Sequence, residues 1–266
     1  MNTPQPHVAG LSPKDRKIVI SGLILVTAAG WLYILYMAWA MENMHLVDMW
    51  MPPMGGMRAW TAWDFLMLFL MWFIMMIAMM TPSVTPMVMM FTTVSRQKKL
   101  KNQPYASTFI FLTGYLVAWA LYSVFASAVQ WPLHGSNILD PMMYSNSYLL
   151  SGSILVLAGI YQWTPMKNAC LNQCRTPLGF LMAAWKDGNS GAFQMGLYHG
   201  MFCVGCCWAL MAVLLAVGVM NMLWVLLIAL FVLAEKILPF SVAMTRAITG
   251  TGLIVWGGYW LSLYPW

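Results

Sequence analysis

Charged residues are scarce in this sequence. Only 8% of its 266 residues are Asp, Glu, Lys or Arg, whereas 61% are hydrophobic. A soluble domain ordinarily carries about 25% charged residues, so a chain this poor in charge cannot cover a surface that faces water. The sequence also lacks the G-x4-G-K-[ST] phosphate-binding loop, which argues against a nucleotide partner. Composition therefore favours an integral membrane protein over a soluble enzyme.

Several apolar runs are long enough to cross about 30 Å of hydrocarbon at about 1.5 Å per residue. The predicted spans cover residues 18–40, 62–88, 107–130, 146–164, 194–217, 220–237 and 243–262. We expect a single transmembrane domain over residues 1–266, an all-α polytopic bundle of about seven helices in the lipid bilayer. Residues 41–60 then form an outer loop, and residues 165–193 form a cytoplasmic loop.

The basic residues indicate how this bundle is oriented. Twelve of the thirteen lysines and arginines fall on one side of the predicted spans, including Lys236 beside the last junction, and only Arg58 falls on the other. Lys and Arg accumulate in short cytoplasmic loops, so we predict a cytoplasmic N-terminus and a periplasmic C-terminus. The same bias explains the net charge of +6 without a nucleic-acid partner. The first run is longer than the apolar region of a signal peptide, so we expect it to be a retained anchor.

Three thiols and an imidazole lie close together in the apolar stretch LYHGMFCVGCCWALM. His199, Cys203 and Cys206 share one helical stripe at about 100° per residue, with Cys207 slightly to the side. Soft metal ions prefer thiolate, thioether and imidazole donors. The alternative is packing, because cysteine also behaves as a small hydrophobe between helices. The stripe is about 10 Å long from His199 to Cys206, so a second segment must contribute ligands if one ion is bound.

A second pair of thiols lies in the predicted cytoplasmic loop. Cys170 and Cys174 are four residues apart, which places both sulfurs on one side of a short helix. Structural disulfides are not expected in a reducing compartment, so the pair is read as free thiols or as metal ligands. The flanking residues Pro165 and Pro177 suggest an ordered hairpin that brings the pair toward the span 194–217.

Methionines dominate two further segments. In the span 62–88 they recur at helical spacing and include Met75, Met79 and Met80, with Asp64 at the outer end. The outer loop 41–60 is also rich in methionine and contains Met44 and His45. Thioether groups with an imidazole suit Cu(I), although methionine is also a common gap-filler in cores. Glu235, at the inner end of the span 220–237, is a further candidate ligand, with ordinary hydrogen bonding as the alternative.

Five short patterns resemble one bacterial family. They are W-x2-M-x2-A-M-M-x-P from Trp72, C-L-x2-C-R-x-P from Cys170, H-G-x2-C-x-G-C-C-W-A-L-M from His199, G-x-M-N from Gly218, and Glu235-Lys236. These patterns are similar to those of the predicted metal-binding integral membrane proteins of unknown function. The resemblance implies a metal connection and a multi-pass protein of the bacterial inner membrane, but it supplies no reaction.

We predict that this protein binds or moves copper(I) through its Met, His and Cys ligands, with zinc or iron as alternative metals. The outer loop would capture the ion, the methionine stripe would pass it inward, and the thiols would hold it near the cytoplasmic face. Ligand identity does not fix a direction, so import, export and delivery to a metallochaperone or membrane enzyme stay open. The alternatives are a metal-dependent membrane oxidoreductase or its subunit, and an accessory subunit of a larger membrane complex. No enzymatic activity is assigned.

Overall fold

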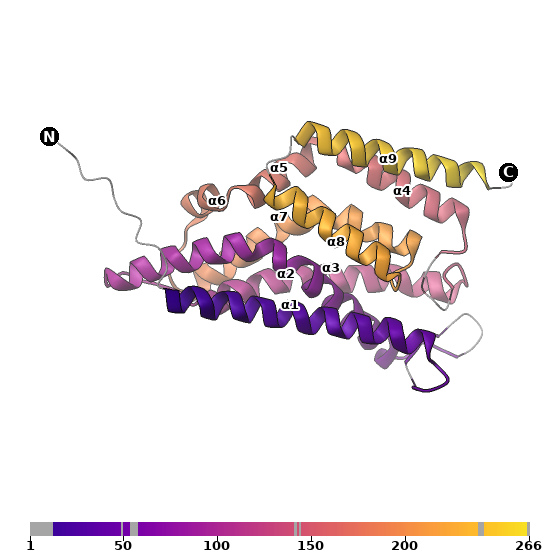
Figure 1. Cartoon of the computed structure of the whole chain (residues 1–266), viewed down its shortest axis with the longest axis horizontal. Helices are drawn as coiled ribbons and strands as arrows, with labels where there is room; N and C mark the ends of the chain where they lie inside the picture. The colour runs from indigo at the N-terminus through magenta and orange to yellow at the C-terminus, as the bar shows by residue number, and fades with distance from the viewer. Residues whose placement is uncertain are drawn as a thin grey trace.

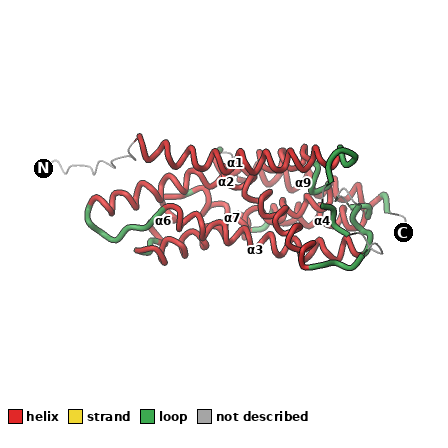
Figure 2. The backbone as a smooth tube through the Cα atoms, turned by 90° about the horizontal axis from the view of Figure 1, so that it is seen from below, coloured by secondary structure: helices red, strands yellow, loops and turns green. Residues whose placement is uncertain are grey.

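The computed structural model describes residues 13–48, 50–53, 58–140, 143, 145–238 and 242–264, and helices contain most of them. The helices are α1 (Pro13–Glu42), α2 (Ala62–Leu100), α3 (Thr108–Gly135), α4 (Tyr148–Gln162), α5 (Pro165–Arg175), α6 (Pro177–Ala184), α7 (Gly188–Val217), α8 (Met222–Ile237) and α9 (Val242–Ser262). The longer helices run roughly along one common axis, and no strand is drawn in the described part of the chain (Figures 1 and 2). The expectation of an all-α bundle is confirmed.

Helix α7 lies at the centre of the packing. It contacts α3, α4, α5 and α8, whereas α1 packs mainly on α2, and α9 packs on α4 (Figure 1). In its most apolar stretch, 61% of the residues of α7 are buried, compared with 17% for α1. The helix that carries three of the five cysteines is therefore enclosed by protein, and α1 turns most of its apolar surface outward.

Local sequence signals explain where several helices begin and end. Thr61 caps α2, and the Asp64 side chain bonds back to the Thr61 backbone N–H, which completes a capping box. Thr164 caps α5, and Pro165 fills the first helical position, where its missing N–H costs nothing. Gly218 ends α7 with a φ of 101°, a backbone conformation that other residues rarely adopt.

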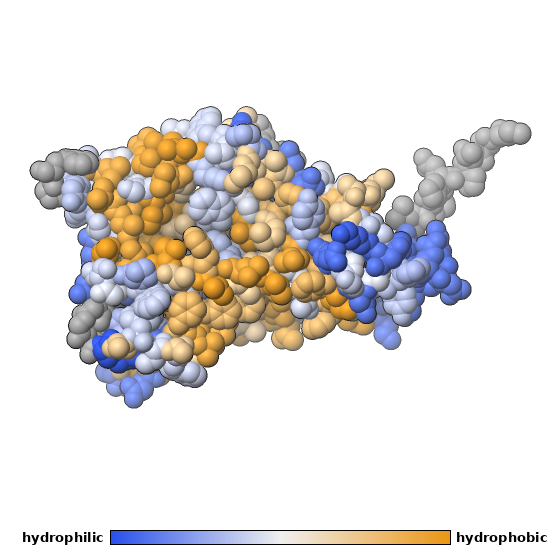
Figure 3. Space-filling view, turned by 180° about the vertical axis from the view of Figure 1, so that it is seen from behind, coloured by the Kyte–Doolittle hydropathy of each residue, from blue (hydrophilic) through white to orange (hydrophobic). Residues whose placement is uncertain are grey.

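Among the described residues, four helices are long and apolar enough to cross a membrane, namely α1, α2, α3 and α7. The pair α4 and α5 would add a fifth span, but it bends by 65° at the break. All seven predicted apolar runs are helical, yet α4 has only 15 residues and α8 only 16. Figure 3 shows hydrophobic residues over the middle of one face and hydrophilic residues toward the end at which α1 begins. The structure is thus compatible with membrane insertion, and the number of seven spans stays a prediction.

Candidate metal site

The thiols of α7 share one buried face. Cys203, Cys206 and Cys207 are each at most 2% exposed. Cys206 Sγ and Cys207 Sγ both donate to the carbonyl oxygen of Cys203, at 3.1 and 2.9 Å. These bonds between residues three and four apart hold the two thiols along the helix and leave the Cys203 sulfur free to face other elements.

Helix α5 brings the remaining two cysteines to α7. The Cys174 thiol of α5 lies near the thiols of Cys203 and Cys206 and interacts with both. Cys170 lies against Gly205, where an added Cβ would come within 2.8 Å of the Cys170 sulfur. All five cysteines are free thiols. A second segment with possible ligands, as the length of the thiol stripe requires, is therefore present beside α7. We call the five cysteines of α5 and α7 the thiol cluster.

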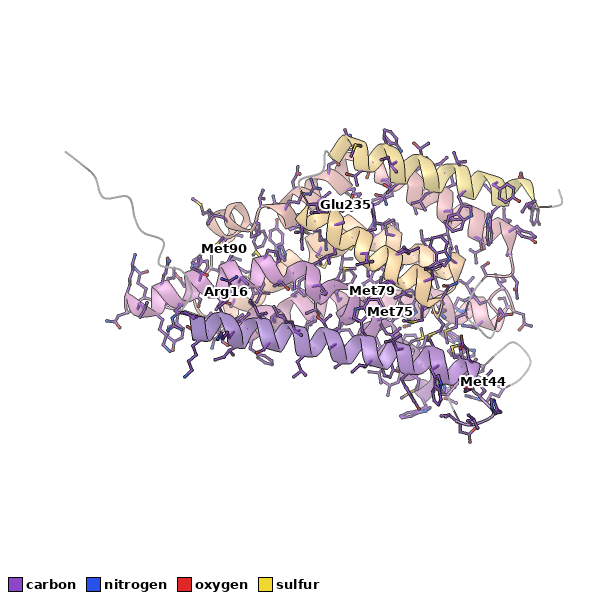
Figure 4. The ribbon with its side chains drawn as sticks, in the orientation of Figure 1. Arg16, Met44, Met75, Met79, Met90 and Glu235 are labelled. Atoms are coloured by element: carbon purple, nitrogen blue, oxygen red, sulfur yellow. The ribbon has the colours of Figure 1, made fainter. Side chains whose placement is uncertain are left out.

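The methionine stripe of α2 reaches the thiol cluster at one point. Met80 Sδ lies 4.0 Å from Cys207 Sγ. Met75 and Met79 are buried on the same helix and lie near the middle of the bundle, whereas Met44 lies at the end where α1 finishes (Figure 4). The sulfur atoms of α2 and α7 thus come together inside the protein.

Two polar groups that the sequence reading missed contact the Cys203 sulfur. Lys236 Nζ of α8 donates to Cys203 Sγ at 2.7 Å, and the Tyr115 hydroxyl of α3 lies 3.1 Å from the same sulfur. The sequence places Lys236 at the edge of a cytoplasmic loop, but the structure buries it, with 7% exposed. The Cys203 sulfur is therefore surrounded by polar groups of α3 and α8 and by a thiol of α5, and not by hydrocarbon alone.

Glu235 forms a buried ion pair beside this cluster. Its Oε1 lies 2.7 Å from Lys167 Nζ, and the two side chains are 2% and 1% exposed. Lys167 also donates to the Gln162 amide oxygen, and Arg175 Nε donates to the Glu235 carbonyl at 2.7 Å. The carboxylate predicted as a candidate metal ligand thus has a lysine partner, and the pair fastens α5 to α8.

His199 lies on the stripe but among aromatic rings. Its ring centroid is 5.1 Å from that of Phe180, 6.2 Å from Tyr115 and 6.3 Å from Phe111. The ring is 2% exposed, and no described residue hydrogen-bonds to its Nδ1 atom. One imidazole nitrogen is therefore buried beside the thiol cluster without a polar partner.

At the outer end, Asp64 has a complete set of polar partners. Its carboxylate receives two hydrogen bonds of 2.6 Å from Arg58 and one of 2.8 Å from Trp50. The hydrogen bond to this carboxylate raises the pKa of Arg58 above its usual value, so the pair stays charged. These contacts give Asp64 a role in starting α2.

The outer methionine loop is described only in part. Met44 and His45 are exposed in the turn after α1. Met49, Met54 and Met57 lie outside the described residues. Metal capture by this loop therefore stays a prediction.

Within the described ranges, no three His, Cys, Asp or Glu side chains are grouped closely enough to hold a metal ion. The thiols instead bond to backbone, lysine and tyrosine groups. Binding of an ion would require these thiols to exchange their present hydrogen bonds for the metal.

Fold and site together define a class of protein, a helical bundle that could cross a membrane and that has thiols and thioethers at its centre. More particularly, the chain matches a family model described as PpoB2, copper chaperone, over residues 69–260. That range includes all five cysteines and most of the chain, so the chain belongs to the PpoB2 copper chaperone family. No curated protein and no solved structure matches it. Membership agrees with the metal connection expected from the sequence and associates the chain with copper handling.

Proposed function

We propose that this protein binds copper(I) as cargo at the thiol cluster and passes it to an acceptor at the cytoplasmic side of a bacterial inner membrane. The observation that carries the proposal is the meeting of free thiols from α5 and α7 with Met80 of α2. Thiolate and thioether sulfur are the donors that Cu(I) prefers over harder ions. Membership in a copper chaperone family supports the same metal.

The route of the ion follows the methionines. Met44 and His45 would capture copper(I) at the outer loop, and Met75 and Met79 would lead it along α2. The contact of Met80 with Cys207 supports a transfer from thioether to thiolate at this point. Thioether needs no deprotonation to bind, whereas thiolate binds a soft ion more tightly, so the ion would move toward the stronger donors. His199 is the next donor beyond the thiols on α7.

The triple variant Cys203→Ser, Cys206→Ser and Cys207→Ser tests the proposal. We expect it to retain less than about a tenth of the copper(I) bound by the purified wild-type protein, because oxygen is a poor donor for this soft ion. Serine is close in size to cysteine, so helix content and elution in detergent should change little. Bound copper is measured by elemental analysis after equilibration with a Cu(I) chelator.

Other results of this experiment would point elsewhere. Equal copper in the variant and the wild type would reject the thiol cluster as the site. A visible or paramagnetic spectrum that responds to oxidant would favour an oxidoreductase. A wild-type protein that binds no metal under these conditions would favour an accessory subunit.

The cytoplasmic side of the bundle is inferred from its basic end. Lys98 of α2 pairs with Asp187 at the start of α7 at 2.5 Å, and Arg96 pairs with Asp15 at the start of α1. Hydrogen bonding to Lys98 lowers the pKa of Asp187, so this pair is charged at neutral pH. Lysines and arginines thus gather where α1 and α7 begin and α2 ends, which supports a cytoplasmic location for this end.

A reporter fusion checks the orientation. Alkaline phosphatase joined after Trp266 should be active, because the enzyme folds only in the periplasm, and a green fluorescent protein at the same position should stay dark. The reverse pattern would place the C-terminus in the cytoplasm and would reject an odd number of spans with a cytoplasmic N-terminus.

A further inference from the structure

The charges buried near the thiol cluster leave one cation without a carboxylate partner. Lys167 and Lys236 are both buried, and Glu235 forms its ion pair with Lys167. Asp64, the other buried carboxylate among the described residues, pairs with Arg58 at the outer end. No described carboxylate lies within ion-pair distance of Lys236. An ammonium in such an interior is costly unless an anion balances it.

The sulfur atoms are the only groups placed to provide that anion in the described part of the structure. Lys236 Nζ contacts Cys203 Sγ at 2.7 Å and Ser83 Oγ at 3.2 Å. A copper(I) ion held by a pair of thiolates carries one net negative charge. The net charge of this complex together with the Lys236 ammonium is zero.

We propose that Lys236 is a positioning residue that neutralises a copper(I)–dithiolate complex formed at Cys203. This inference rests on the proposed function, since it assigns the counter-cation of the same site. An ammonium has no lone pair, so Lys236 cannot be a ligand and donates its N–H to the sulfur from outside the coordination shell. Ser83 accepts a second hydrogen bond from Lys236 and keeps it directed at Cys203.

The zero net charge of Lys236 and the copper(I)–dithiolate complex should affect the affinity for copper(I). Without Lys236, the copper(I)–dithiolate complex would be a single unbalanced anion among apolar helices. Hydrogen bonds to charged groups are worth about 1.5–3 kcal/mol, which corresponds to roughly 10-fold to 150-fold in an equilibrium constant. Copper(I) retention should therefore depend on a cation at position 236 and not only on the thiols.

Competition with a Cu(I) chelator tests this role. The neutral variants Lys236→Met and Lys236→Gln should bind copper(I) at least about 10-fold more weakly than the wild type. Lys236→Arg keeps the charge and is the matched control, and it should restore affinity to within about threefold of the wild type, because Arg is also a cationic donor. At saturating copper(I), the ultraviolet absorption of the copper–thiolate bond should persist in all three variants, since no ligand is removed.

The outcomes separate this inference from the proposed function. A wild-type protein that binds no copper(I) would reject the proposed function, and this inference with it. Copper(I) affinity that is equal in the wild type, Lys236→Met and Lys236→Gln would reject the inference alone. The inference alone would also be rejected if Lys236→Arg loses as much copper(I) affinity as the neutral variants while its thermal unfolding curve in detergent shows that it is folded. Lys236→Gln keeps a polar side chain and serves if Lys236→Met does not fold.

Discussion

Replacement of Glu235 by alanine is expected to lower the free energy of unfolding by about 3–5 kcal/mol, because it leaves a buried lysine without its counter-ion. Lys167 is 1% exposed, and its ammonium would retain the Gln162 amide oxygen as a hydrogen-bond acceptor and the Phe231 ring, 6.0 Å away, but no carboxylate. Unfolding followed by tryptophan fluorescence in detergent, with increasing denaturant, measures the change.

A double variant separates charge from shape in this prediction. Lys167→Met with Glu235→Leu removes both charges and keeps apolar bulk, so it should recover most of the lost stability. Asp187→Asn is the control for an exposed pair, since Asp187 and its partner Lys98 reach solvent, and it should change stability by less than about 1 kcal/mol. A double variant as unstable as Glu235→Ala would show that the ion pair is not the cause.

The same ion pair should affect the thiol cluster. Lys167 lies on α5 together with Cys174, and Glu235 lies on α8 next to Lys236. If Glu235→Ala loosens α5 from α8, Cys174 loses its fixed position against Cys203. Copper(I) affinity should therefore fall in Glu235→Ala and be partly restored in the double variant. One buried pair thus connects the stability of the bundle with its metal site.

Much of the thiol cluster could be predicted from spacing alone. The helical period places Cys203 and Cys206 on one face of α7, and the short rise along that face requires a second segment. The pair Cys170 and Cys174 was the evident candidate, because prolines on both sides define a separate short helix. The structure brings the pair to α7 as expected. Metal binding by these thiols remains a proposal.

The burial of Lys236 was not predicted, because a lysine at the end of an apolar run is usually a basic flank. A signal was nevertheless present in the spacing of α8. Val225, Ala229 and Val232 recur at intervals of four and three residues, and the next positions on that face are Glu235 and Lys236. Every one of these residues is buried. Helical periodicity continued through the charged residues would therefore have predicted two charges inside the bundle.

For Asp64, the sequence suggested a metal ligand where the structure shows a helix cap. An acid at the end of an apolar stripe suggested a ligand, but Thr61 three residues earlier is the sequence signature of a helix start. The capping box and the pair with Arg58 account for this carboxylate.

The number of spans is harder to predict from the sequence, because the short helices α4 and α8 are apolar without being long. Hydropathy reports directly how apolar a segment is, but it reports less directly how long the helix in that segment is.

Gly196→Val is expected to prevent stable packing of α3 on α7. A Cβ at Gly196 would lie 1.9 Å from the Phe111 carbonyl oxygen, and one at Gly114 would lie 2.2 Å from the Phe193 carbonyl oxygen. Both obstacles are backbone atoms, so no side-chain rotation relieves the overlap and the helices must separate. We expect a loss of at least about 3 kcal/mol in the free energy of unfolding, at the upper end of ordinary overpacking.

Two helical glycines provide matched controls for this close approach. A Cβ at Gly22 of α1 or at Gly258 of α9 meets no atom within 4 Å. Gly22→Ala and Gly258→Ala should therefore be neutral or stabilising by up to about 1 kcal/mol, because alanine favours a helix over glycine. Unfolding in detergent compares them with Gly196→Ala and Gly196→Val, and equal stability of Gly196→Ala and Gly22→Ala would contradict the predicted contact. Since α3 carries Tyr115 and α7 carries Cys203, separation of these helices should also break their 3.1 Å contact and lower copper(I) affinity.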